Sequence, residues 1–358
     1  MKNGLKSLLS LLLIAALSLS MAACGKSDDG SGDNGTEDEN HPEFAYTAEY
    51  KKLATDQDAS LYPRCYTQDG FYSTSYEKIG NNTPEGVTPE YEGQYDIYGT
   101  FLYFVGFDGT VEKLENYQRL DVPTNDNNLK DFNASSDVSG VCIAPDGNLV
   151  VMEIQYKSWS EAPDGMDSSS NEYWEYYKYE QTYYIRWLEP DGTEISCAPV
   201  EIDPDTYLDT YNMKLDNDGN VVCLYDGRQI VGIAPDGKFS YNIGVDNDSY
   251  IDSIVKLADG TIAASISSGS GTEVRPIDTA NKKLSDTSYP LENIYLYNAI
   301  SGSNGYDLYY TNGTNFYGLK LETGEQEKLF SWLSCDVNGN DMNSVTVRED
   351  GSVVGVIT

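Results

Sequence analysis

Short apolar runs separated by Asp-Gly or Asn-Gly recur along this chain, and they narrow the folds that it can adopt. The clearest copy covers residues 143–152, where Ile-Ala and Leu-Val-Val-Met flank Pro-Asp-Gly-Asn. Asp-Gly and Asn-Gly supply the positive backbone angles that tight hairpin turns require. We therefore interpret each copy as a β-hairpin.

Two interleaved series of such turns run through the chain. The first series ends at Gly70, Gly147, Gly219, Gly260, Gly305 and Gly351, and the second ends at Gly109, Gly192, Gly237, Asn281 and Gly324. In the later part of the chain, successive turns of one series lie 41 to 46 residues apart. A repeat of this length with four strands per unit is typical of β-propellers. The sequence thus predicts an all-β propeller of about six four-stranded blades.

The predicted propeller occupies residues 44–358. Its expected blades cover about 61–120, 137–202, 211–245, 251–291 and 294–330, and a partial sixth blade covers 342–358. Insertions at about 78–94 and 155–181 lengthen the first two blades. The alternating segment 44–53 could pair into the last blade and close the ring. Because the sixth blade has only one hairpin, we also expect these 358 residues to be the N-terminal part of a longer protein.

Composition supports many short strands and limits the partners. The chain contains 30 Tyr, which favours strands, and 32 Gly, which favours turns. Its formal net charge is -35. A surface this acidic repels nucleic acids and anionic lipids, so we expect no nucleic-acid partner.

The first 24 residues have the layout of a secretory signal. Lys2 and Lys6 precede an apolar run over 7–20, which is too short to span a membrane comfortably, and Met21-Ala-Ala leads to Cys24. This ending resembles the lipobox of bacterial lipoproteins, with Met21 where Leu is usual. The resemblance implies that Cys24 carries a lipid and begins the mature protein. The alternative is an ordinary secretory signal that happens to end near a Cys.

These features predict a location and a spacer. Residues 1–23 are the expected signal peptide, and 24–43 are an acidic linker without large apolar residues, which should be disordered. The lipid on Cys24 would hold the chain on the outer face of the cell membrane, and the linker would keep the propeller away from it.

The sequence offers few residues for catalysis or metal binding. The only His is His41, in the linker, which leaves no Ser-His-Asp, Cys-His or His-based metal site. Residues 336–341 resemble the start of a calcium loop, but Asp341 and Val347 stand where Gly and Glu are needed. We therefore expect no enzyme, no cofactor and no metal.

Aromatic residues in and after the second insertion are the candidate ligand-binding residues. They are Trp159, Trp174, Tyr176 and Trp187. Such side chains on a propeller face can stack on sugar rings or anchor a protein partner. The alternative is that they serve packing, because aromatic residues are also favoured in strands.

The whole pattern resembles a group of lipoproteins from anaerobic Gram-positive gut bacteria. Those proteins have a lipobox, an acidic linker, a Tyr-rich propeller and then the solute-binding domain of an ABC importer. Residues 43–50, 106–111 and 345–353 carry the likeness.

This resemblance implies a non-catalytic binding or spacing module that serves solute capture for an ABC importer. The solute-binding domain itself is not among these 358 residues. The alternative is therefore a surface propeller that stands alone and binds a glycan or a protein partner.

Overall fold

The computed structural model divides the chain into two compact units, Met1–Ala45 and Tyr46–Thr358. It describes Glu49, Thr88, Glu92, Gly93, Ile294 and Leu296 and residues 61–81, 96–125, 129–167, 169–203, 206–292, 299–335 and 342–357. The predicted signal peptide, Cys24, the linker and nearly all of segment 44–53 lie outside the described residues.

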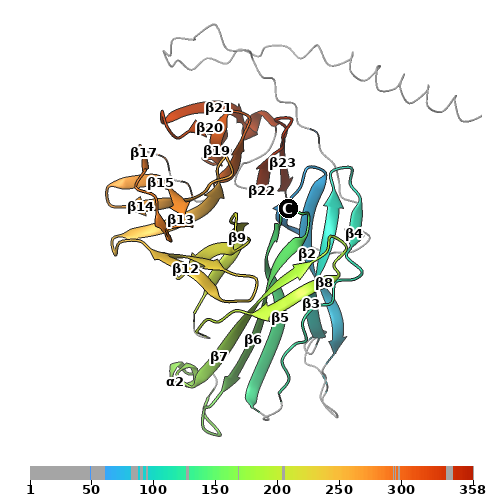
Figure 1. The fold of residues 1–358 in the computed structure, drawn as a ribbon. Helices are drawn as coiled ribbons and strands as arrows, with labels where there is room; N and C mark the ends of the chain where they lie inside the picture. Colours follow the sequence, from blue (N-terminus) through green and yellow to red (C-terminus); the bar gives the residue numbers. More distant parts are fainter. Residues whose placement is uncertain are drawn as a thin grey trace, which may run out of the picture. The chain divides into compact units, whose positions relative to one another are not determined.

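The second unit consists of small antiparallel sheets that follow one another along the chain (Figure 1). Blade 1 contains β1 (Tyr62–Tyr66), β2 (Gly70–Asn81), β3 (Asp96–Gly106) and β4 (Val111–Lys113). Blade 2 contains β5 (Lys130–Ile143), β6 (Leu149–Ser160), the short helix α2 (Asn171–Trp174), β7 (Tyr177–Leu188) and β8 (Glu194–Pro199). Blade 3 contains β9 (Leu208–Leu215), β10 (Val221–Tyr225), β11 (Gln229–Ile233) and β12 (Phe239–Gly244).

The later sheets continue the same order. Blade 4 contains β13 (Ser249–Lys256), β14 (Ile262–Ser268), β15 (Gly271–Asp278), β16 (Lys283–Leu284) and β17 (Tyr289–Leu291), which also pairs with β15. Blade 5 contains β18 (Ile300–Ser303), β19 (Tyr306–Thr311), β20 (Asn315–Lys320) and β21 (Glu325–Ser331), followed by the 3-10 turn η1 (Trp332–Cys335). Blade 6 contains β22 (Met342–Val347) and β23 (Val353–Ile357).

The first strands of the six sheets form a closed ring. Strands β1, β5, β9, β13, β18 and β22 contact one another in that order, and β22 contacts β1. The Tyr66 hydroxyl donates to the Ser344 carbonyl at 3.1 Å, and Arg348 Nε donates to the Gln68 carbonyl at 3.1 Å. The predicted all-β propeller is thus confirmed, with four blades of four strands, blade 4 with β17 as a fifth strand, and a sixth blade that has two strands in the described residues.

Both series of Asp-Gly and Asn-Gly turns lie on one face of the propeller. Because consecutive strands are antiparallel, turns from first to second strand and from third to fourth strand meet at the same end of each blade. We call this end the turn face. The connections from second to third strand and from blade to blade lie at the opposite end, which we call the tip face.

Aspartates on the turn face have a structural role. Asp146 Oδ1 accepts from the Asn148 backbone N–H at 3.1 Å, and Asp191 and Asp259 accept in the same way from the residue two positions on. The Gly that follows takes a positive φ, such as 90° at Gly147. These local bonds explain why Asp-Gly recurs.

The core lies between neighbouring blades. Val221 packs into the cluster shared with blade 2, while the adjacent Val222 packs into the cluster shared with blade 4. Both are fully buried. Adjacent residues of a strand point to opposite faces, so a strand covered on both sides is apolar throughout. Cys142 and Cys223 are buried free thiols within these strands.

Candidate functional site

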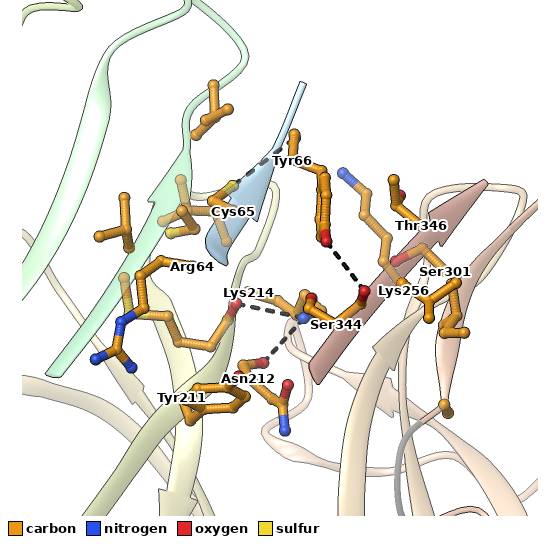
Figure 2. Close-up of a pocket in the computed structure, with 18 of the residues that line it drawn as sticks. Arg64, Cys65, Tyr66, Tyr211, Asn212, Lys214, Lys256, Ser301, Ser344 and Thr346 are labelled. Atoms are coloured by element: carbon orange, nitrogen blue, oxygen red, sulfur yellow. Dashed lines mark hydrogen bonds between the residues drawn. The ribbon is translucent and has the colours of Figure 1, made fainter. Parts of the chain in front are cut away.

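A cavity of about 520 Å³ lies at the centre of the ring, toward the turn face. Its walls come from β1, β5, β9, β13, β18 and β22, from the last residue of β19, and from the turns that follow β5 and β9. Figure 2 shows the side chains that point into it. Every blade therefore contributes to this one space.

Irregular pairing in two strands shapes the wall of the cavity. In β1, Pro63 pairs with Ser73 and Cys65 with Tyr72, so Arg64 is an extra residue in a β-bulge. In β9, Lys214 pairs with Val222 while Asp209 pairs with Leu224, so residues 210–213 lie opposite a single residue of β10. Bulges bend a strand and redirect its side chains. Here they occur where Arg64 and Tyr211–Lys214 line the cavity.

Three basic side chains line the cavity. They are Arg64, Lys214 and Lys256. Lys214 Nζ donates to the backbone carbonyls of Asn212 at 3.0 Å and Met213 at 3.5 Å. Within the part of the chain that the structure describes, none of the three has a carboxylate within 4 Å.

The only carboxylate among the described residues that line the cavity is already satisfied. Asp216 Oδ1 accepts from the backbone N–H groups of Asp218 at 3.0 Å and Asn220 at 2.8 Å. Its Oδ2 accepts from Asn220 Nδ2 at 2.9 Å and from the Tyr241 hydroxyl at 3.1 Å. The cavity is therefore positive, although the chain carries 58 acidic and 23 basic residues.

Burial shifts the pKa values of several groups in the wall. Burial is the main cause of the lowered pKa of the Lys214 amino group. The charge of Lys256 lowers this pKa further, and the thiols of Cys65 and Cys142 raise it. Burial raises the pKa of Cys65 to about 11 and that of Tyr66 to about 12. Both groups are thus neutral near pH 7, and the charge in the cavity is cationic.

The structure brings three of the four aromatic candidates together at the tip of the long β6–β7 hairpin. Trp159 Nε1 donates to Glu161 Oε1 at 3.4 Å. Trp174, in α2, is 57% exposed and its ring lies 5.4 Å from that of Tyr177. Tyr176 follows α2 and is half-buried. These residues lie on the tip face, away from the turn face where the cavity lies.

Trp187 lies elsewhere. It is near the other end of β7, where it pairs with Val150 and packs against the core between blades 2 and 3. Its buried Nε1 has no hydrogen-bond acceptor among the described residues. Trp187 is therefore a packing residue in this structure, separate from the other three candidates.

Sequence reasoning missed the cationic cavity. The signal was present, because Lys214 and Lys256 each interrupt an apolar inner strand, in Met-Lys-Leu and Val-Lys-Leu. A cation at such a position, where neighbouring blades cover both faces, needs a reason. The one-residue bulge at Arg64 has no comparable signal in the sequence.

A second polar cluster is structural. Glu153 and Arg186 form an ion pair and are 0% and 2% exposed. Glu153 also accepts from the Tyr117 hydroxyl at 3.0 Å and from the Leu120 backbone N–H at 2.8 Å. The pair thereby ties the segment that follows β4 to blade 2.

The described residues contain neither a metal-binding cluster nor a membrane-spanning helix. They contain no group of three or more His, Cys, Asp or Glu side chains placed to hold a metal ion. No helix in the same part of the chain combines the length and the apolar character needed to cross a membrane.

No protein-family model matches this chain. No curated protein matches it either. Among solved structures, it resembles a protein of unknown function from Bacteroides caccae at 11% identity and a TM-score of 0.36, over 85% of this chain and 83% of the other.

Two further solved structures contain similar regions. A puromycin hydrolase matches at 14% identity and a TM-score of 0.41, over 80% of this chain and 40% of the hydrolase. The extracellular domain of a one-component system from B. thetaiotaomicron matches at 12% identity and a TM-score of 0.33, over 86% of this chain and 48% of the other. This chain thus spans less than half of these two proteins, and the likeness concerns the fold alone.

The comparison with puromycin hydrolase corrects one prediction. We expected this chain not to be an enzyme, yet a similar propeller region is part of a hydrolase. The prediction rested on the lack of a His-based catalytic set in the sequence, and it is wrong as stated, because neither that lack nor a propeller fold excludes catalysis. The likeness assigns this chain neither a reaction nor a catalytic residue.

Proposed function

We propose that this chain is a surface-displayed propeller that captures a small anionic solute in its central cavity. The observation that supports this is that Arg64, Lys214 and Lys256 all line one cavity and have no nearby carboxylate in the described residues. Like charges in a partly desolvated space raise the free energy of the protein, and a bound anion relieves that repulsion. The cavity volume lies in the range of about 300–1,000 Å³ found for small-molecule sites.

The acidic surface of the chain should make the cavity selective among anions. Elsewhere the chain presents a net negative charge, which repels anions at a distance. An anion that binds must therefore gain from local contacts with the three cations. Such a site selects a particular solute better than it collects anions in general.

The proposal includes the place where capture occurs. A lipid on Cys24 would hold the propeller on the outer face of the cell membrane, and the captured solute would pass to an ABC importer. The lipobox-like Met21-Ala-Ala-Cys24 and the resemblance to importer-associated lipoproteins support these two steps. Replacement of Cys24 by Ser should release the protein from the cell envelope, and retention of that variant would contradict the anchor.

Calorimetry tests the binding proposal. Mature protein should bind members of a panel of carboxylates and phosphate esters more tightly than their neutral amides or alcohols. Lys256→Met should weaken binding about fivefold, the value of a partly exposed charge pair. Lys238→Met is the matched control, because Lys238 is exposed on the turn face beside Asp236 and does not line the cavity. Equal binding of neutral analogues would overturn the proposal.

A second candidate function rests on the tip face. The exposed Tyr and Trp side chains of the described residues all belong to the tip half of their blades; they are Tyr62, Tyr76, Tyr98, Trp174, Tyr179, Tyr207, Tyr211 and Tyr250. Rings of this kind stack on sugars or anchor protein partners. Under this alternative the propeller binds a surface glycan or protein through Trp159, Trp174 and Tyr176. Loss of glycan-array or pull-down binding in Trp174→Ala would support it.

A further inference from the structure

The cavity contains an aromatic ring and hydroxyl groups as well as its three cations. Tyr211 lines the cavity and is 45% exposed, and the Arg64 guanidinium lies 5.5 Å from its ring centroid. Residues with hydroxyl groups also line the cavity; they are Ser301, Thr311, Ser344 and Thr346. This mixture is richer than the binding of a simple anion requires.

We propose that the anionic solute is an acidic sugar of about disaccharide size, with carboxylates on its rings. This inference rests on the proposed function, because it identifies the class of solute that the same cavity takes. Three features of the cavity carry it: the separation of the cations, the exposed aromatic ring and the polar wall.

The cations are spread across the cavity. In Figure 2, Arg64 and Tyr211 lie on one side, Lys214 is near the middle, and Lys256 reaches in from the other side. A compact anion such as phosphate is best held by cations that converge on one point. Cations spaced along a cavity instead match charges spaced along a molecule, as carboxylates are along a chain of sugar acids.

Tyr211 provides a surface for a sugar ring. Aromatic side chains present an apolar face and a polar edge, which suits the apolar face and polar rim of a pyranose. Arg64 interacts with this ring, so it can hold a carboxylate beside a stacked sugar. One wall thus provides both contacts that a sugar acid needs.

The remaining wall suits the hydroxyl groups of a sugar. Ser301, Ser344 and Thr346 can each donate and accept a hydrogen bond. Asn212 adds an amide with both capacities. A site that pairs with sugar hydroxyls rejects analogues that lack them, because its own polar groups would then be left unpaired.

Calorimetry with three probes tests the inference on mature protein. The probes are di-galacturonate, the neutral disaccharide galactobiose, and citrate, which has three carboxylates and no sugar ring. Di-galacturonate should bind about tenfold more tightly than either of the others. Tyr211→Ala should weaken di-galacturonate roughly two- to tenfold, the range for loss of one aromatic stack, and should leave citrate unchanged. Tyr211→Phe keeps the ring and should retain the affinity.

The outcomes separate this inference from the proposal beneath it. If citrate binds as tightly as di-galacturonate and Tyr211→Ala affects neither, the cavity binds anions but not acidic sugars, and the inference fails alone. If galactobiose binds as tightly as di-galacturonate and Lys256→Met has no effect, both fail. If folded protein binds none of the probes, nor disaccharides that contain glucuronate, the inference is also overturned. Circular dichroism of each variant confirms that it is folded.

Discussion

The two faces of this propeller are made by the same strands but carry different residues. The turn face has short connections in which Asp binds the backbone and Gly takes a positive φ. The tip face has longer and less regular connections, and it carries the exposed aromatic rings. Of the large hydrophobic side chains that are exposed in the described residues, only Ile195 belongs to the turn face.

This difference indicates where the sequence serves folding and where it is free to serve binding. Each connection on the turn face satisfies its own hydrogen bonds, so its residues are explained without any ligand. Connections on the tip face are not constrained in this way, and loops of this kind are where binding functions concentrate. The cavity differs from both, because inner strands build most of its wall, bulges in β1 and β9 shape it, and only the turns that follow β5 and β9 add to it.

The largest expected loss of stability comes from breaking the ion pair inside blade 2, which lies on neither the turn face nor the tip face. Arg186→Met removes the partner of Glu153, whose side chain is fully buried. Breaking a buried pair on one side leaves an uncompensated charge and costs about 3–5 kcal/mol. Denaturant unfolding should show a loss of this size in the free energy of unfolding. A double variant, Glu153→Met with Arg186→Met, should recover part of it, and no recovery would contradict the buried-charge explanation.

A pair of glycine substitutions separates two roles on the turn face. At Gly237, φ is 84° and an added Cβ would lie 1.9 Å from the Pro199 carbonyl oxygen. At Gly147, φ is 90° and nothing lies within 4 Å of such an atom. Gly147→Ala should therefore cost about 1–2 kcal/mol for the left-handed backbone alone. Gly237→Ala should exceed this by about 1–3 kcal/mol for overpacking against blade 2. Equal losses in denaturant unfolding would show that the turn at Gly237 moves away from its neighbour.

The lowered pKa values of aspartates in the turns predict that acid reduces the stability of the protein. Hydrogen bonds from the Thr193 backbone and from the Lys238 backbone hold the pKa values of Asp191 and Asp236 below their usual range, and the Ser352 hydroxyl and N–H lower that of Asp350. A carboxyl group with a lowered pKa in the folded state contributes stability above its unfolded pKa of about 3.9, and this is lost as pH falls through the lower folded value.

Thermal melts should therefore show a falling melting temperature below about pH 4. Asp191→Asn keeps a side-chain oxygen that can accept the Thr193 N–H but cannot ionise. The triple Asn variant at positions 191, 236 and 350 should lose less stability between pH 5 and pH 2 than the wild type, on the scale set by that titration. An unchanged pH profile would mean that other carboxylates control acid unfolding.

The contrast between the faces also explains what the sequence could predict. Strand and turn positions were predictable because Asp-Gly signals and apolar runs act within a few residues. The blade repeat followed from their spacing. The cavity was not predictable, because a bulge of one residue at Arg64 changes which side chains face inward.

The aromatic candidates show the same limit. Trp174 and Trp187 are close in sequence, but the stretch of β7 from Tyr177 to Trp187 separates their surroundings by roughly 33 Å at about 3.3 Å per residue. Trp174 is thus exposed at the tip, and Trp187 is partly buried against the core between blades 2 and 3. We grouped the two residues because they are close in sequence, but an extended strand keeps them far apart.

The smallest expected effect on stability is at the tip face. Trp174 is 57% exposed and contacts the rings of Tyr173 and Tyr177. Trp174→Ala should change the free energy of unfolding by no more than about 0.5–1 kcal/mol, since an exposed ring adds little beyond these contacts. Trp187→Ala should cost more, up to about 3 kcal/mol, because this partly buried ring packs against the core.

The free energies of unfolding of these two variants therefore compare how much an aromatic side chain contributes to stability at the two ends of β7. A large loss in Trp174→Ala would mean that the tip helix supports the blade, and the tip face would then owe its aromatic residues to packing. A small loss leaves Trp174 without a structural reason for its exposure. In that case binding becomes the remaining explanation for a Trp at the end of so long a hairpin.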